Sequence, residues 1–288
     1  MRRVHSPTVR LRRLAGELRR RREHAGHQIT DAAKTLGWSG TKLGRFEAAE
    51  TRRIKSADLD ALLDLYKVDD PAEREALHQL ARDAKDRGWW SQYKGVFTDQ
   101  LPDFEAEASA IRTFEPQVIP GLLQTPEYAE AVIRGGQAHD DEAITARVAA
   151  RMERQQILNR HDPPEYWAII DEAALRRPIG TPEVMSAQLR HLVRMATREG
   201  VTVQVLPFAA GSHAANMGAL VIMDFAEPLD PSIAYTETYA ASLILERPEE
   251  VARFTRVFAH ASASALPGAE SVAFIRDVAQ SLGSSADE

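Results

Sequence analysis

The side chains best suited to chemistry in this sequence are cationic, and they concentrate near the start of the chain. Residues 1–60 hold 15 Lys and Arg against 7 Asp and Glu, whereas residues 61–288 hold 21 against 35. The net charge of −6 therefore conceals a basic segment followed by an acidic one. This asymmetry predicts that only the basic segment binds a polyanion, the alternative being a solvated basic surface.

Signatures of catalysis and metal binding are absent from the sequence. The chain has no cysteine, which excludes disulfides, thiolate metal sites and thiol nucleophiles. Its nine histidines show no ligand spacing, and it contains no HExxH, no GxSxG and no phosphate-binding glycine loop. Ser212 and His213 are adjacent, which is a poor geometry for a nucleophile and its base. We therefore expect no enzyme activity, no metal and no cofactor.

Carboxylates lie near the ends of predicted strands in the second half of the chain. They either line a pocket or face water, and we favour water; they are Asp171, Glu172, Glu237 and Glu246. Glu153 and Arg154 could join Glu115 in a network on a helix surface.

Apolar residues at helical spacing predict that the basic segment folds as five short helices. Gly37 ends the second helix and supplies a tight turn, and Ser39 is a suitable N-cap for the third, in which Leu43 and Phe46 face inward. Two short helices joined by a glycine turn form a helix-turn-helix. The five predicted helices lie near residues 11–25, 28–37, 40–47, 56–66 and 70–84.

Residues 11–66 resemble the Xre-type helix-turn-helix proteins, which are relatives of the phage repressors. The resemblance is carried by Arg22, by the stretch ITDAAKTLGWS, by Leu43 and by the ending Arg45, Phe46 and Glu47. In that family the third helix lies in the major groove of double-stranded DNA and touches base edges. The resemblance implies that the base contacts come from Gly40, Thr41, Lys42 and Arg45.

The resemblance also implies contacts to the phosphate backbone and one structural pair. The pair is Arg22 and Glu47, which joins the first helix to the end of the third. One departure from the family follows Glu47, where Ala48, Ala49 and Glu50 replace the usual glycine; it predicts a longer helix or a different loop. The phosphate contacts are Gln28, Ile29, Ser39, Arg52, Arg53 and Lys55.

Two glycines occupy the third helix, although glycine costs roughly 1 kcal/mol against alanine inside a helix. Gly40 lies at the first helical position, where the missing side chain lets the backbone approach DNA. Gly44 lies in the middle and faces either the sugar-phosphate backbone or the second helix. The sequence does not distinguish between these two orientations of Gly44.

The rest of the chain predicts an aromatic linker and a larger α+β domain with a mainly antiparallel sheet. We expect the helix-turn-helix domain at residues 1–85, the linker at 86–103, the α+β domain at 104–282 and a disordered tail at 283–288. Within the larger domain, residues 104–111 are predicted as a helix. Further helices are predicted at 125–134, 140–160, 181–199, 247–266 and 270–282, and strands at 165–175, 201–208, 218–225, 232–238 and 241–246.

The order of these elements resembles the Xre-type transcription regulators, typical of actinobacteria, that carry a C-terminal domain of unknown function. The stretches RTFEPQVIPGLLQTPEYAEAV, ARMERQQIL, VTVQVLPF and GALVIMDF carry this resemblance. It implies transcription regulation and a small acidic protein as partner. Because one recognition helix reads too few base pairs alone, we also expect a homodimer.

Three hypotheses follow for the function of the larger domain. It binds the protein partner and dimerises, or it senses a small-molecule effector, or it is an enzyme tethered to DNA by the first domain. No apolar run approaches the ~20 residues of a membrane helix, and no secretory signal is visible, so we expect a cytoplasmic protein without a membrane anchor.

Overall fold

The computed structural model describes residues 7–51, 53–85, 88–93, 95–97, 100–136, 140–227, 230–238 and 240–284. The chain divides into two units, each described below by itself. The first unit comprises Met1–Gln92 and Gln100–Glu107, and the second comprises Tyr93–Asp99 and Ala108–Glu288.

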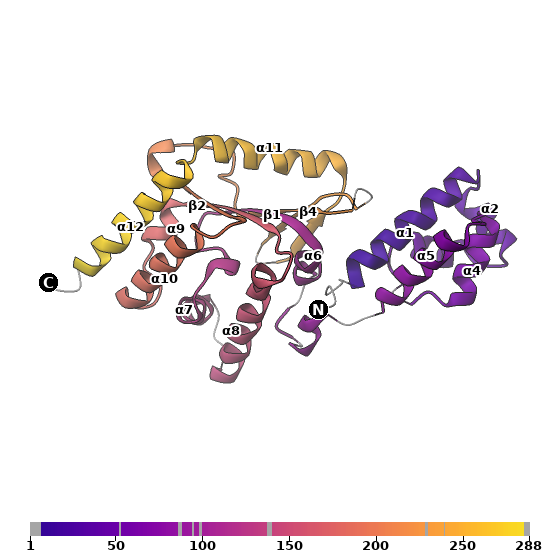
Figure 1. Ribbon diagram of the computed structural model, residues 1–288, viewed down its shortest axis with the longest axis horizontal. Coiled ribbons are helices and arrows are strands. Elements are labelled where there is room, and N and C mark those ends of the chain that lie inside the picture. The colour runs from indigo at the N-terminus through magenta and orange to yellow at the C-terminus, as the bar shows by residue number, and fades with distance from the viewer. Residues whose placement is uncertain are drawn as a thin grey trace. The chain divides into compact units, whose positions relative to one another are not determined.

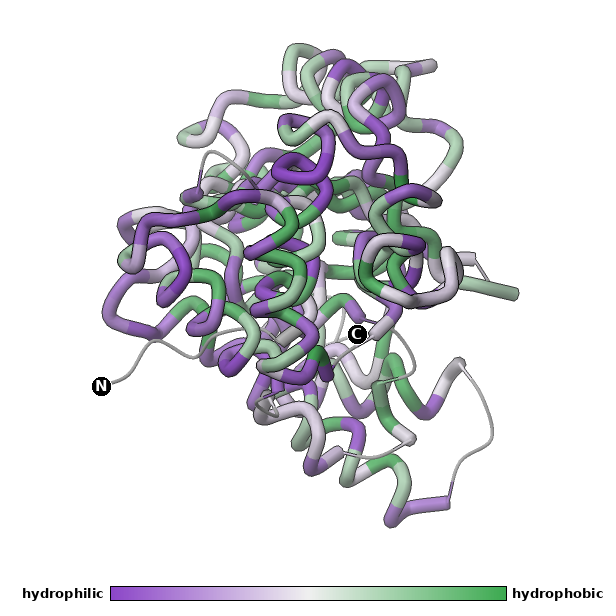
Figure 2. The backbone as a smooth tube through the Cα atoms, turned by 90° about the vertical axis from the view of Figure 1, so that its right-hand side faces the viewer, coloured by the Kyte–Doolittle hydropathy of each residue, from purple (hydrophilic) through white to green (hydrophobic). Residues whose placement is uncertain are grey.

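The first unit is all-α, and its five predicted helices are present among the described residues. Apolar positions on one face of each helix meet in a common core, and hydrophobic and hydrophilic segments alternate along the helical turns in Figure 2. The helices are α1 (Pro7–His24), α2 (Ile29–Thr35), α3 (Gly40–Glu47), α4 (Ser56–Leu65) and α5 (Pro71–Asp83). The fully buried core positions include Leu14, Leu18, Ala32, Leu43, Leu59, Leu62 and Leu63.

Four successive helices of this unit end in the same left-handed turn. After α1 and α2 the left-handed residue is a glycine, Gly26 and Gly37, as the sequence suggests. After α3 and α4 it is Ala49, with a φ of 56°, and Lys67, with a φ of 57°. In each turn the following N–H donates to a carbonyl five residues back, which closes the last turn of the helix.

The helix predicted at residues 104–111 is confirmed for residues 104–107 and wrong for residues 108–111. Residues Leu101–Glu107 form a short helix, α6, that belongs to the first unit, and Ala108–Glu115 form a strand, β1, that belongs to the second. Phe104 of α6 lies 4.9 Å from the Arg12 guanidinium of α1, measured to the ring centroid. Inside the predicted linker, Trp89–Gln92 form a 3₁₀ helix, η1, which belongs to the first unit.

The strands described in the second unit form one six-stranded sheet with the order β3-β2-β1-β4-β5-β6. The expectation of a mainly antiparallel sheet is wrong, because β1 pairs with β2, and β2 with β3, in parallel. The remaining pairs, β1 with β4, β4 with β5 and β5 with β6, are antiparallel. The strand bounds are Glu165–Asp171 for β2, Val201–Leu206 for β3, Leu220–Phe225 for β4, Ile233–Glu237 for β5 and Ser242–Leu245 for β6.

Long helical connections make the parallel pairs possible, because a parallel strand needs a crossover whereas an antiparallel one needs only a hairpin. Helices α7 (Pro126–Gly136) and α8 (Asp141–Gln155), with the 3₁₀ helices η2 (Gly121–Leu123) and η3 (Gln156–Asn159), lead from β1 to β2. Helices α9 (Glu172–Arg176) and α10 (Pro182–Met195) lead from β2 to β3. The 3₁₀ helix η4 (Phe208–Ala210) follows β3, and α11 (Pro248–Ser264) and α12 (Gly268–Ser284) follow β6.

Helices cover both faces of this sheet. In Figure 1, α11 lies along one face, and α7, α8, α9 and α10 lie on the other side. On the α11 side, Phe258 packs with Phe114, Ile169 and Ile222 of the central strands. Helix α12 packs against α10 and β3. It continues to Ser284, two residues into the tail predicted at 283–288, and the last four residues lie outside the described part of the chain.

None of the described helices has the length and the apolar content of a membrane-spanning segment.

Candidate nucleic-acid interface

The helix-turn-helix is built by α2, the turn at Gly37 and α3. Ser39 is the N-cap of α3, and its Oγ accepts a hydrogen bond of 3.2 Å from the Lys42 backbone N–H. Leu43 and Phe46 are buried and fix the inner face of α3 on the core. The outer face presents Gly40, Thr41 and Arg45, all exposed. This outer face is free of core contacts and has the residue types that read base edges in a major groove.

Arg45 is one of the exposed base-contacting residues predicted from the sequence, with 59% of its side chain exposed. Its Nε lies 3.6 Å from Glu50 Oε2, and the Glu50 side chain is 61% exposed. An exposed pair of this kind contributes at most ~1 kcal/mol. Glu50 therefore competes only weakly with DNA for the guanidinium.

Lys42 is held by contacts that sequence reasoning did not foresee. Its Nζ lies 2.8 Å from Asp58 Oδ1 of α4 and 3.7 Å from the centroid of the Trp38 ring. The ion pair and the cation–π contact together hold the ammonium against α4. A base contact from Lys42 therefore requires this side chain to leave Asp58.

The predicted phosphate contacts lie at the start of α2, in the turn before α3 and in the segment after α3. Gln28, Ser39, Arg53 and Lys55 are exposed. Ile29 is the first residue of α2, and its side chain packs on the core, so that its backbone N–H is the group available to a phosphate. Arg52 lies outside the described residues.

Arg22 and Glu47, which the sequence predicts as a pair, lie in direct contact. Arg22 Nε donates to Glu47 Oε1 at 2.8 Å, and a terminal nitrogen of Arg22 donates to Oε2 at 3.0 Å. A third bond of 2.7 Å runs from Arg22 to the His27 carbonyl oxygen. The side chains are only 9% and 6% exposed, and the hydrogen bonds that Arg22 donates to Glu47 raise the pKa of Arg22 above its ordinary value. This bidentate pair joins the C-terminal end of α1 to the end of α3.

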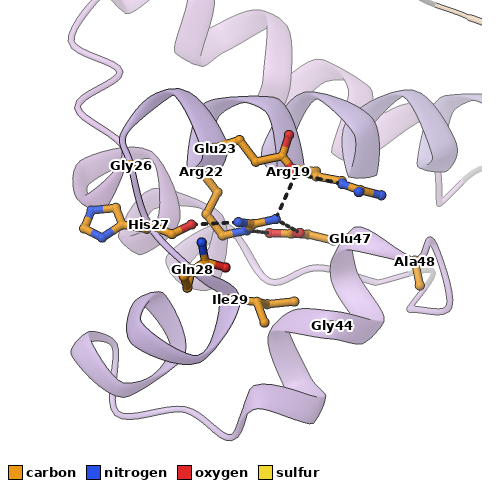
Figure 3. A pocket seen from close by; sticks show the side chains of 10 residues that line it. All are labelled: Arg19, Arg22, Glu23, Gly26, His27, Gln28, Ile29, Gly44, Glu47 and Ala48. Atoms are coloured by element: carbon orange, nitrogen blue, oxygen red, sulfur yellow. Dashed lines mark hydrogen bonds and ion pairs between the residues drawn. The ribbon is translucent and has the colours of Figure 1, made fainter.

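A surface hollow lies beside this pair, between the end of α1, the start of α2 and α3 (Figure 3). Gly44 is one of the residues that line it, and a Cβ placed on Gly44 would lie 3.8 Å from Ile29 Cδ1. Gly44 therefore faces the second helix, which resolves the orientation that the sequence left open. The hollow is lined by Arg19, Arg22, Glu23, Gly26, His27, Gln28, Ile29, Gly44, Glu47 and Ala48.

The loop after α3 resolves the departure at Ala48, Ala49 and Glu50. Helix α3 is not prolonged: Ala49 takes the left-handed conformation that a glycine takes elsewhere. The Glu50 N–H donates to the Arg45 carbonyl at 3.0 Å, and the Ala49 N–H to the Phe46 carbonyl at 3.2 Å. The chain therefore makes the usual turn with an unusual residue.

In the second unit, two of the strand-end carboxylates are engaged in structure, where we expected them to face water. Asp171 Oδ1 accepts a bond of 2.8 Å from the Ala173 N–H and caps α9. Glu172 is 8% exposed and accepts bonds from the Phe208 N–H and from Arg176. Glu237 is exposed, as expected.

Ser212 and His213 do not form a nucleophile and its base. The Ser212 hydroxyl accepts a bond of 3.1 Å from Asn216. His213 is 9% exposed, stacks edge-on with Phe114, and places its Nε2 3.8 Å from Asp171 Oδ2. The histidine is thus a packed side chain of the sheet edge.

Comparison with known protein families gives two matches. Residues 98–277 match the model of a domain of unknown function (DUF5753), and residues 13–77 match that of a helix-turn-helix domain. No curated protein and no solved structure matches the chain.

Proposed function

Because this chain belongs to the family defined by the domain of unknown function DUF5753 and carries a helix-turn-helix domain ahead of it, we propose that it is a sequence-specific transcription regulator of the Xre type, as found in actinobacteria. The helix-turn-helix domain identifies a DNA-binding regulator. The finer assignment is supported by one observation above all: α3 buries Leu43 and Phe46 and turns Gly40, Thr41 and Arg45 to solvent. Such a helix fits the major groove of double-stranded DNA.

The base readers in this proposal are Arg45 and Thr41, with Gly40 allowing close approach and Lys42 joining after release from Asp58. Arg45 can donate two bonds to the O6 and N7 atoms of a guanine. Gln28, Ile29, Ser39, Arg53 and Lys55 would contact phosphates, which position the protein without reading sequence. Arg22 and Glu47 fix the angle between α1 and α3 and take no part in reading.

We also propose a homodimer on inverted half-sites, since one helix contacts only a few base pairs. The second unit would provide the regulatory function by binding, without catalysis. Its resemblance to regulators that work with a small acidic protein supports such a partner here. A regulator of this type acts in the cytoplasm, on the nucleoid.

A small-molecule effector is the second candidate for the regulatory signal. One observation favours it: the half-buried Arg151 of the second unit donates a bond of 2.7 Å to Gln124 Oε1 and makes no salt bridge with a carboxylate of the described residues.

Selection of binding sites from a random duplex library tests the DNA proposal. The full chain should enrich an inverted repeat, and Arg45→Ala should weaken binding to the selected site by ~1–3 kcal/mol and relax the preference at one base pair. Arg82, an exposed arginine on α5, provides the control: Arg82→Ala should leave both affinity and preference unchanged.

Three outcomes would contradict the proposal in different ways. Failure to enrich any sequence would remove sequence-specific binding. An equal loss on all sequences would make Arg45 a phosphate contact. Enrichment of a single unrepeated half-site would exclude the dimer.

A further inference from the structure

The two cations of helix α3 differ in how freely they can meet DNA. Lys42 and Arg45 are three residues apart, so their side chains lie on the same side of the helix. The Arg45 side chain is 59% exposed, whereas that of Lys42 is 36% exposed and places its Nζ 2.8 Å from Asp58 Oδ1 of α4. Arg45 is therefore largely in solvent, and the Lys42 ammonium is occupied by the neighbouring helix.

An aromatic pair completes the surroundings of the Lys42 ammonium. Its Nζ lies 3.7 Å from the centroid of the Trp38 ring and 5.7 Å from that of Phe46. The two rings meet edge-on, with their centroids 5.8 Å apart, and Phe46 is buried in the core. The face of a tryptophan attracts a cation, so Trp38 adds to the attraction of Asp58 and holds the ammonium from a fixed position.

Asp58 is fixed on its own helix. It lies in the first turn of α4, where the helix dipole favours a negative charge. The Asp58 side chain is 22% exposed, so its pair with Lys42 is less screened by salt than the exposed pair of Arg45 and Glu50. The next residue, Leu59, is fully buried and anchors this turn in the core. Asp58 therefore stays in place when the Lys42 side chain moves.

We propose that Asp58 is a positioning residue that sets the base specificity of the domain by controlling how far Lys42 takes part in base reading, a role that rests on the proposed binding of α3 in the major groove. A lysine that reads a base donates to the O6 and N7 atoms of a guanine. To do so, Lys42 gives up its contacts with Asp58 and Trp38. The carboxylate and the guanine thus compete for one ammonium.

This competition fixes the direction of the expected effects. In the parent chain, the preference for guanine at the base pair that Lys42 reads is weakened by the pair with Asp58. Removing the carboxylate should strengthen that preference by about two- to five-fold, the usual worth of a partly exposed ion pair. The preference at the base pair that Arg45 reads should stay unchanged, because the printed partner of Arg45 is Glu50 rather than Asp58.

A panel of duplexes tests the proposal. The full chain first selects its site from a random duplex library, and each base pair of one half-site is then replaced in turn. Anisotropy titrations give the ratio of the affinities for guanine and for the other bases at each position. A change of net charge alters all affinities alike and leaves these ratios unchanged. Lys42→Ala identifies the base pair that Lys42 reads, as the one where the guanine preference is lost.

Three variants then isolate the role of the carboxylate. Asp58→Asn should raise the guanine ratio at that base pair by about two- to five-fold. In the background of Lys42→Ala, Asp58→Asn should change no ratio, because the side chain that it releases is missing. Asp64→Asn is the matched control: it removes the same charge from the same helix, at a carboxylate that is 70% exposed and paired with Arg74, and should change no ratio.

Three outcomes overturn the role of Asp58. Lys42→Ala changes no ratio, or Asp58→Asn changes no ratio at the base pair that Lys42 reads, or Asp58→Asn has the same effect without Lys42. A pair that merely joins α3 to α4 gives the second outcome, together with a lower free energy of unfolding. If Asp58→Asn fails to fold, Asp58→Ser removes the carboxylate with a residue suited to the first turn of a helix.

The same measurements separate this role from the proposed DNA binding. If the parent chain enriches no sequence, the binding of α3 to DNA is wrong, and the role of Asp58 is wrong with it. If the parent chain selects a site and Asp58→Asn shifts no ratio, only the role of Asp58 is wrong.

Discussion

Ala49 closes helix α3 in the left-handed backbone region, and glycine at this position should stabilise the first unit. Its φ of 56° is a conformation that costs a non-glycine residue about 1–2 kcal/mol. Glycine avoids this cost but loses about 0.5–1 kcal/mol through the greater freedom of the unfolded chain. The difference predicts that Ala49→Gly raises the free energy of unfolding of this unit by ~0.5–1 kcal/mol.

The neighbouring residue offers a control of opposite sign. Ala48 has a φ of −91° and a ψ of 6°, which alanine adopts without strain. Ala48→Gly should therefore lower the free energy of unfolding by about 0.5–1 kcal/mol, since only the unfolded-state entropy changes. Lys67, with a φ of 57°, repeats the favourable case at the end of α4.

Hydrogen exchange of the α3 and α4 amides in the full chain measures these changes within the first unit alone. A gain of 1 kcal/mol corresponds to a rise in melting temperature of about 4–8 °C for a domain of this size. If Ala49→Gly and Ala48→Gly shifted the free energy of unfolding in the same direction, the assignment of a left-handed conformation to Ala49 would be refuted. DNA affinity should stay unchanged in Ala49→Gly, because the Glu50 N–H still bonds to the Arg45 carbonyl.

Two further predictions concern the charged pairs of the first unit. Glu47→Ala leaves the Arg22 guanidinium buried without its carboxylate, so it should lower the free energy of unfolding by ~3–5 kcal/mol, measured by urea titration. The control is Glu75→Ala, which removes an exposed pair with Arg82 and should change the free energy of unfolding by less than about 1 kcal/mol. A similar loss in both variants would refute the structural role of Arg22 and Glu47. Glu50→Gln removes the ion pair with Arg45 and should tighten DNA binding about two- to five-fold at low salt, because an exposed pair is worth at most ~1 kcal/mol. Anisotropy titrations measure this affinity. An unchanged affinity would show that Glu50 does not compete with DNA for this arginine.

The elements with a strong local signal were predictable from the sequence. Leu43 and Phe46 at helical spacing, Gly37 in the turn and Ser39 at the cap specify α3 with contacts inside a dozen residues. The strands β2 to β6 also lie inside their predicted ranges, since their β-branched and apolar runs are bounded by polar or turn residues. In these segments local preference and tertiary structure agree.

Strand β1 shows where local preference fails. Its sequence begins with two alanines, which favour helices, and the helix predicted at 104–111 covers the first half of this strand. Yet β1 lies inside the sheet between β2 and β4, and pairing on both sides outweighs the intrinsic preference of the segment. Between residues 165 and 206 the sequence alternates strand, helix and strand, which is a pattern typical of crossover connections. This pattern is the signal in the sequence that indicates the parallel pairing of β2 and β3.

By itself, then, the sequence determined that the chain has a small helical unit with a helix-turn-helix and a larger α+β unit, because helix periodicity, caps and turns act between residues close in the chain. Only the tertiary structure decided the partners of individual side chains. Lys42 meets Asp58, and Gly44 faces Ile29. These pairs lie 16 and 15 residues apart, and their contacts depend on how whole elements pack, which no local pattern specifies.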